Sequence, residues 1–363
     1  MILAAGNALQ YLFFAVLAGT LLLQLIPSTH RPALSIPFFV PAAAAALLPA
    51  VSFVPIVQLT RTIASGRDMS FFGALERILF QYEVGQSWVV LFVLSFFLLG
   101  IFILFFHSTG MPRAAAVVGL VLIMGMIGAL GASGHAANAI PLIGGTLHFF
   151  HLLAVSLWIG TLLMVSWFAV SYKQWASFLE WFTLIAVMCV IIIAFTGVIM
   201  GQLLTDPFIG SWALPYGEAL IWKHLFYIVI LLFALFNGIF IRRRLQQSTD
   251  YNPRQWLRAE SLTAMLIFVI TAFMTEQEPG GSLHYENPAF LFHVLYPASV
   301  PDSASFQLQL HPITILSVLL SIGFLYLMAQ SFHRGRSPFS VFVLGCMFVL
   351  SAYTGLVYIL DFV

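Results

Sequence analysis

The sequence predicts an all-α protein, a polytopic transmembrane helix bundle with about ten membrane-spanning helices. Of its 363 residues 61% are hydrophobic and only 7% are charged, with a mean hydropathy of +1.02, whereas a soluble domain carries roughly 25% charged residues. A helix needs about 20 apolar residues to cross the bilayer, because unpaired backbone groups are costly in lipid. The chain contains about ten such stretches.

We expect the spans, in chain order, at about 3–26, 36–60, 87–107, 114–133, 146–171, 176–203, 217–241, 256–275, 311–331 and 338–360. The first stretch has no basic segment before it and no small-residue cleavage site, so we expect a retained helix rather than a signal peptide. Residues 68–82, after the second span, are expected to form an amphipathic segment. The two cysteines, Cys189 and Cys346, fall inside apolar spans and are interpreted as packing residues.

Basic residues are distributed unevenly between the two sets of loops. One set holds ten of the fourteen, namely Arg31, Arg113, Lys173, Arg242, Arg243, Arg244, Arg254, Arg258, Arg334 and Arg336. The opposite set holds only Arg61, Arg67 and Arg77. Because basic loops remain in the cytoplasm, we expect both termini outside, and a bacterial plasma membrane as the location.

The first four spans resemble the next four. Asn7-Ala-Leu-Gln10 with Ala18-Gly-Thr-Leu-Leu parallels His148-Phe-Phe-His151 with Ile159-Gly-Thr-Leu-Leu at the same spacing. Gly85 and Gly217 each open a long span beside an aromatic residue. We therefore expect a degenerate repeat in residues 1–133 and 134–278, then an external loop at 279–310 and two C-terminal helices at 311–363.

Three histidines are expected at the outer membrane surface. His148 and His151 are three residues apart, hence on the same side of a helix, and a short loop connects them to His135 at the end of the preceding span. Neutral imidazole suits copper, zinc and iron, and thioether favours Cu(I). We predict a metal site at these histidines, with Met200, Met274 and Met126 as further candidate ligands that are otherwise ordinary packing residues.

Other polar side chains are candidates for secondary roles. Lys223 lies well inside a span, where an unpaired ammonium costs about 2.5–3.5 kcal/mol. Glu218 is the nearest acid in the sequence, but five residues apart on a helix is poor geometry, so the partner is Glu276 or a backbone carbonyl, or the side chain extends to the interface. His224 and His311 complete a site or cap helices. The acidic outer stretch containing His284 either attracts a cation or is simply solvated.

At these residues the sequence resembles the copper-resistance D family, which comprises CopD and PcoD proteins and the membrane part of YcnJ-like proteins. The resemblance covers about residues 75–280, and its segments are Ser133-Gly-His-Ala-Ala137, His151-Leu-Leu-Ala-Val-Ser-Leu-Trp-Ile-Gly160, Phe195-Thr-Gly197, Tyr216-Gly-Glu-Ala-Leu-Ile-Trp-Lys223 and Glu260. It implies an inner-membrane protein that handles copper, with His135 and His151 as ligands. The last two spans lie outside it.

Three functions are compatible with these features. The first is copper capture at the outer face, followed by import or delivery to a separate extracytoplasmic copper carrier or a membrane enzyme complex. The second is haem b binding and electron transfer, with His151 paired to His224 or His148 to His311. The third is an anchoring subunit. We expect no enzyme, because no nucleophile and base pair is evident, and no nucleic-acid partner at a net charge of +1.

Overall fold

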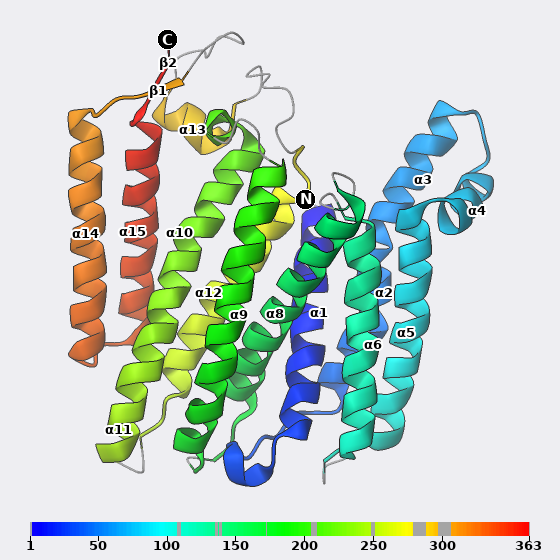
Figure 1. The fold of residues 1–363 in the computed structure, drawn as a ribbon, viewed down its shortest axis with the longest axis horizontal. Coiled ribbons are helices and arrows are strands. Elements are labelled where there is room, and N and C mark those ends of the chain that lie inside the picture. Colours follow the sequence, from blue (N-terminus) through cyan, green and yellow to red (C-terminus); the bar gives the residue numbers. More distant parts are fainter. Residues whose placement is uncertain are drawn as a thin grey trace. The chain divides into compact units, whose positions relative to one another are not determined.

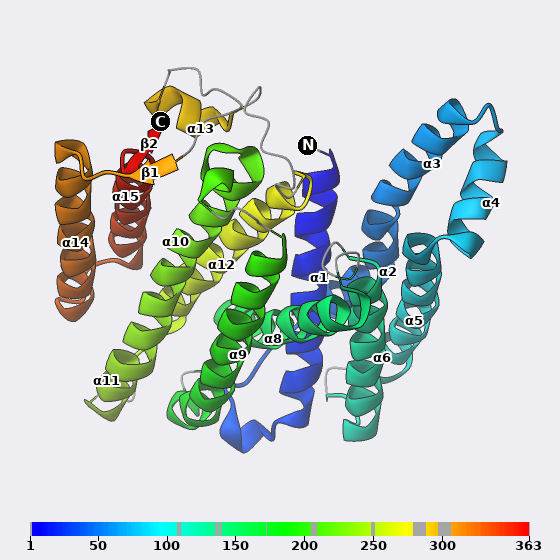
Figure 2. The same ribbon diagram turned by 45° about the horizontal axis from the view of Figure 1, so that its top comes forward.

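The computed structural model describes residues 2–106, 110–134, 137, 140–171, 173–204, 209–247, 251–278, 288–296 and 306–362. Within these residues, ten helices are long and apolar enough to cross a membrane (Figures 1 and 2). The predicted all-α polytopic bundle is therefore confirmed. The chain forms two compact units, unit 1 (Met1–Leu203 with Ser248–Arg254) and unit 2 (Leu204–Gln247 with Gln255–Val363). The orientation in the membrane stays a prediction.

Unit 1 combines membrane-length helices with shorter ones. Its elements are α1 (Ile2–Leu25), the short 3₁₀ helix η1 (Ser28–His30), α2 (Phe39–Ser52), α3 (Val54–Gly66), α4 (Phe71–Gln81), α5 (Glu83–Phe105), α6 (Arg113–Ala132), α8 (Pro141–Phe168) and α9 (Trp175–Leu204). The predicted second span is divided into α2 and α3 at Phe53, between Pro49 and Pro55. Prolines lack the N–H that continues a helix, which explains the break.

The predicted amphipathic segment forms α4. The hydroxyl of Ser70 caps the helix by accepting a hydrogen bond from the Gly73 N–H at 3.2 Å, a common helix start. Phe72 and Phe80 of this helix are exposed. A short helix that follows a span and exposes aromatic side chains is typical of the membrane interface.

The most extensive helix contact in unit 1 is the crossing of α1 and α8, which can be followed in both ribbon views (Figures 1 and 2). Gly19 and Gly160 face each other there, and a Cβ on either would collide with backbone atoms of the other helix. Small residues allow such approach in membrane bundles. The two glycines hold corresponding positions in the predicted repeat.

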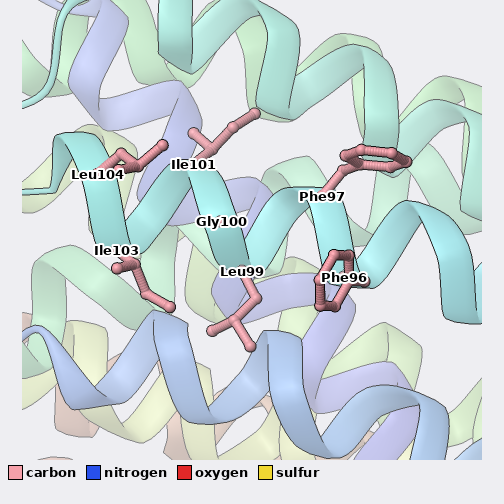
Figure 3. A pocket seen from close by; sticks show the side chains of 7 residues that line it. All are labelled: Phe96, Phe97, Leu99, Gly100, Ile101, Ile103 and Leu104. Atoms are coloured by element: carbon pink, nitrogen blue, oxygen red, sulfur yellow. The ribbon is translucent and has the colours of Figure 1, made fainter.

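The exposed surface of α5 is apolar and slightly hollowed. A shallow hollow on it is lined by Phe96, Phe97, Leu99, Gly100, Ile101, Ile103 and Leu104 (Figure 3). All of these residues are apolar and come from one helix. The hollow is therefore interpreted as lipid-facing surface and offers no ligand for an ion.

Unit 2 holds the remaining spans. Its elements are η2 (Gly210–Ala213), α10 (Pro215–Phe236), the π-helix η3 (Asn237–Ile241), α11 (Arg242–Gln247), α12 (Arg254–Met274), α13 (Phe290–Leu295), β1 (Phe306–Leu308), α14 (Pro312–His333), α15 (Pro338–Val357) and β2 (Leu360–Phe362). Helices α14 and α15 pack side by side. Strands β1 and β2 pair antiparallel, with Gln307 opposite Asp361.

The second pair of glycines in the predicted repeat also shares a local environment. A Cβ on Gly85 would collide with the carbonyl of Ile78, and one on Gly217 would collide with the carbonyl of Ser211. In each case the short helix that precedes the span folds back over its first turn. These contacts favour the repeat, which stays a prediction together with the limits 1–133, 134–278, 279–310 and 311–363.

Candidate metal centre

His148 and His151 lie on α8, about 10 Å and 15 Å along its axis from Pro141. Both side chains are half-buried. A separation of three residues places them on one side of the helix. Their neighbours differ, because His151 contacts α9 and His148 contacts the end of α6.

A hydrogen bond fixes the ring of His151. Its Nδ1 lies 2.9 Å from the hydroxyl oxygen of Thr196, and the same hydroxyl donates to the carbonyl of Ile192 at 2.6 Å. A hydroxyl has only one proton to donate, so its oxygen accepts from the Nδ1–H of His151. This assignment leaves the lone pair on Nε2, the arrangement that histidine ligands of metals adopt.

Gly197 provides the space for this ring. A Cβ at position 197 would lie 3.5 Å from Cε1 of His151, in ordinary contact, and a larger side chain would reach into the imidazole. Thr196 therefore supplies a hydrogen bond to the ring of His151, and the adjacent Gly197 leaves room for that ring. This pair belongs to a segment that the sequence analysis singled out, although the sequence does not reveal its contact with His151.

His148 lies against Gly134, two residues beyond the end of α6. A Cβ on Gly134 would lie 2.8 Å from Nδ1 of His148, which is closer than real Cβ contacts. Gly131 and Gly145 bring the two helices together, since a Cβ on Gly131 would lie 2.9 Å from the carbonyl oxygen of Gly145. Gly134 directly precedes His135, which lies outside the described residues.

The three candidate methionines have different surroundings. Met200 is half-buried on α9, one helical turn beyond Thr196 and so on the same side of the helix. Met126 is fully buried in α6. Met274 belongs to unit 2, where it packs in an apolar cluster with Tyr216, Ala219 and Leu220. Of these three methionines, Met200 is therefore the one that lies one helical turn from Thr196, the hydrogen-bond partner of His151.

No group of three His, Cys, Asp or Glu side chains is placed to hold a metal ion within the part of the chain that the structure describes. That part includes His148 and His151 but excludes His135 and His284. The predicted three-histidine cluster is therefore still a prediction.

Glu218 forms two hydrogen bonds within unit 2. Its Oε2 accepts the backbone N–H of Phe292 at 2.9 Å and the hydroxyl of Tyr353 at 2.9 Å. The first bond caps the N-terminus of α13, and the second joins α10 to α15. Within the described residues Lys223 forms no ion pair or hydrogen bond, with Glu218 or any other group.

The other candidates in unit 2 are spread over several elements. His224 is exposed and its ring nitrogen Nδ1 donates to the carbonyl of Leu220 at 2.7 Å. His311 is the residue before α14, and its carbonyl accepts the N–H of Ile315 at 3.2 Å. Glu276 is half-buried in the turn after α12. None of these placements assigns a ligand role.

Comparison with protein families adds independent information. Residues 176–274 match the family model described as Copper resistance protein D. This segment belongs to the copper resistance D family. The resemblance noted from the sequence is thereby confirmed over these residues, and the ten membrane-length helices among the described residues make the protein a multi-pass membrane protein. Neither the curated proteins nor the solved structures contain a match.

The copper resistance D segment begins at the start of α9 and ends at the last residue of α12. It includes Thr196, Gly197, Glu218 and Lys223, whereas His148 and His151 precede it. The hydrogen bond between His151 and Thr196 therefore connects α8 directly to the family segment.

Proposed function

We propose that the protein captures copper through His148 and His151 on α8, with His135 as a further ligand, and then imports the ion or delivers it to a partner. The observation that carries this proposal is the bond between His151 and Thr196, which presents Nε2 as a ligand atom and joins α8 to a residue inside the copper resistance D segment. Copper is the cargo here.

The donor set suits copper. Neutral imidazole binds Cu, Zn, Fe and Ni, while thioether selects Cu(I). Met200 supplies a thioether one turn beyond Thr196. His135 follows Gly134, which is in contact with His148. The candidate ligands are thus three histidines, one of which directly follows Gly134, and one methionine. Nitrogen and sulfur ligands of this kind favour copper over hard cations, which prefer oxygen ligands.

The predicted orientation places this end of α8 outside the cell. A separate extracytoplasmic copper carrier or a membrane enzyme complex is then the partner we propose. The haem alternative needs His151 with His224, or His148 with His311, and each pair combines one residue of unit 1 with one of unit 2.

Copper analysis of the purified protein tests the proposal. We compare wild type with a His135→Ala, His148→Ala, His151→Ala variant. His30→Ala is the matched control, because His30 is an exposed histidine next to Thr29, just after the C-terminal end of α1. We expect about one copper per chain in wild type and control, and loss of copper in the triple variant. Equal copper in all three would contradict the proposal, and a haem absorbance band would replace it with the haem alternative.

A further inference from the structure

Unit 2 contains a fully buried pair of polar side chains that copper binding does not use. Glu260 on α12 and Asn237 at the start of the π-helix η3 are each only 2% exposed. The amide Nδ2 of Asn237 donates to Oε2 of Glu260 at 2.6 Å. Both residues lie inside membrane-spanning helices, where ionisable residues are rare and usually functional.

Among the side chains that the structure describes, no counter-ion accompanies this carboxyl group. The charged groups nearest along the elements of unit 2 are Arg258 on α12, Arg243 and Arg244 on α11, His333 and Arg334 at the end of α14, and Lys223 and His224 on α10; α15 has no charged residue, and its titratable side chains are Cys346 and Tyr353. None of them forms an ion pair or hydrogen bond with Glu260, whose one polar partner among the described residues is Asn237. A buried carboxylate without a counter-ion is costly, and a bound proton removes that cost.

A second observation concerns the amide of Asn237. Its Oδ1 is buried and accepts no hydrogen bond from the described residues. A protonated carboxyl group carries an O–H donor. The oxygen and nitrogen of an asparagine amide exchange places by a 180° rotation, and 2.6 Å is an ordinary length for an O–H···O bond.

The pair can therefore hold together in two protonation states. With an ionised Glu260, the amide nitrogen of Asn237 donates, as in the structure. With a protonated Glu260, the rotated amide oxygen accepts. A residue that forms a bond in either state allows the proton to load and unload without leaving a broken contact.

The backbone at Asn237 departs from the regular α-helix. Residues Asn237–Ile241 form a π-helix between α10 and α11, and such wide turns occur often at functional sites. The irregularity begins at the residue that contacts Glu260.

Aromatic side chains close one side of the pair. Phe332 of α14 lies between α12 and η3, with ring centroids 4.1 Å from Trp256 and 5.4 Å from Phe240. Trp256 is one turn before Glu260, and Phe240 is one turn after Asn237, so both lie toward the α11 end of these helices. Along η3, Phe240 lies between Asn237 and the basic residues Arg243 and Arg244 of α11.

We propose that Glu260 and Asn237 form an intramembrane proton-binding site whose exchange with the basic end of unit 2 is limited by Phe332. The occupant is a proton rather than a metal ion, because one carboxyl group and one amide are too few ligands for a hard cation. The site is independent of the copper proposal.

Infrared spectroscopy of the metal-free, detergent-purified protein tests this site. A protonated carboxyl group has a distinct C=O stretch that shifts in D₂O. We expect wild type to show this band at neutral pH and to lose it at alkaline pH. Glu260→Gln should lack the band, and Glu180→Gln, which changes an exposed carboxyl on α9, should retain it. Identical wild-type and Glu260→Gln spectra would overturn the proposal.

Two further variants keep the test decisive if Glu260→Gln folds poorly. Asn237→Ala retains the carboxyl group but removes its hydrogen-bond partner, so the band should move to higher frequency; an unchanged position would count against the pair. Phe332→Ala should speed the D₂O shift at least tenfold, whereas Phe339→Ala, an exposed residue of α15, should not. Loss of the band on adding Na⁺ at constant pH would show a cation site and overturn the proton assignment.

Discussion

Replacing Thr196 by valine should weaken copper binding through His151. Valine has nearly the shape of threonine but cannot accept the Nδ1–H of His151, which lies 2.9 Å from the hydroxyl. Loss of the group that orients a histidine ligand typically reduces metal affinity about 10–100-fold. At about 1.4 kcal/mol for each tenfold change, this is roughly 1.4–2.8 kcal/mol of binding free energy.

Thr196→Ser is the matched control, since serine retains the hydroxyl and should bind copper within about threefold of wild type. The dissociation constant for Cu(I) is measured by competition with a chromogenic chelator, and the thermal unfolding midpoint confirms that both variants are folded. Our reasoning fails if folded Thr196→Val binds copper as tightly as wild type, because His151 then does not depend on this bond as a ligand.

Three other substitutions have defined outcomes. Met200→Leu should weaken Cu(I) binding at least tenfold in the same competition assay, while Met126→Leu, in the core of α6, should leave it unchanged; equal effects would remove Met200 from the site. Gly160→Ala should lower the thermal midpoint because it forces α1 and α8 apart, and overpacking of a core costs about 1–3 kcal/mol of stability. Gly100 has open space around it, so Gly100→Ala should leave the midpoint unchanged. Similar midpoints for the two variants would contradict the crossing. Tyr353→Phe removes the bond to Glu218 and should destabilise the fold by about 1 kcal/mol or more in denaturant unfolding, and an unchanged midpoint would show that this bond contributes nothing.

The membrane spans could be predicted because each depends on local composition. A run of about 20 apolar residues is a sufficient signal by itself, and every predicted span overlaps an observed helix. The break at Phe53 had a visible cause in two prolines, but the sequence does not show whether a proline bends or ends a helix. The π-helix at Asn237 has no local signal beyond a polar residue in an apolar span.

The partners of the polar residues could not be predicted, because they are distant in the chain. Glu218 caps α13 from 74 positions away, and a helix of six residues has no periodicity from which to infer it. The sequence instead offered Glu218 as a partner of Lys223. Likewise, His151 was a candidate ligand from its spacing to His148, but its bond to Thr196 spans 45 positions and only the packing of α8 on α9 reveals it.

Copper K-edge X-ray absorption of the copper-loaded protein tests the central claim most directly, since it identifies the atoms bound to the metal. We expect the multiple scattering of at least two imidazole rings in wild type, reduced in a His148→Ala, His151→Ala variant and unchanged in His30→Ala. Copper surrounded by oxygen alone, or a spectrum that the double variant leaves unaltered, would contradict a copper site on α8.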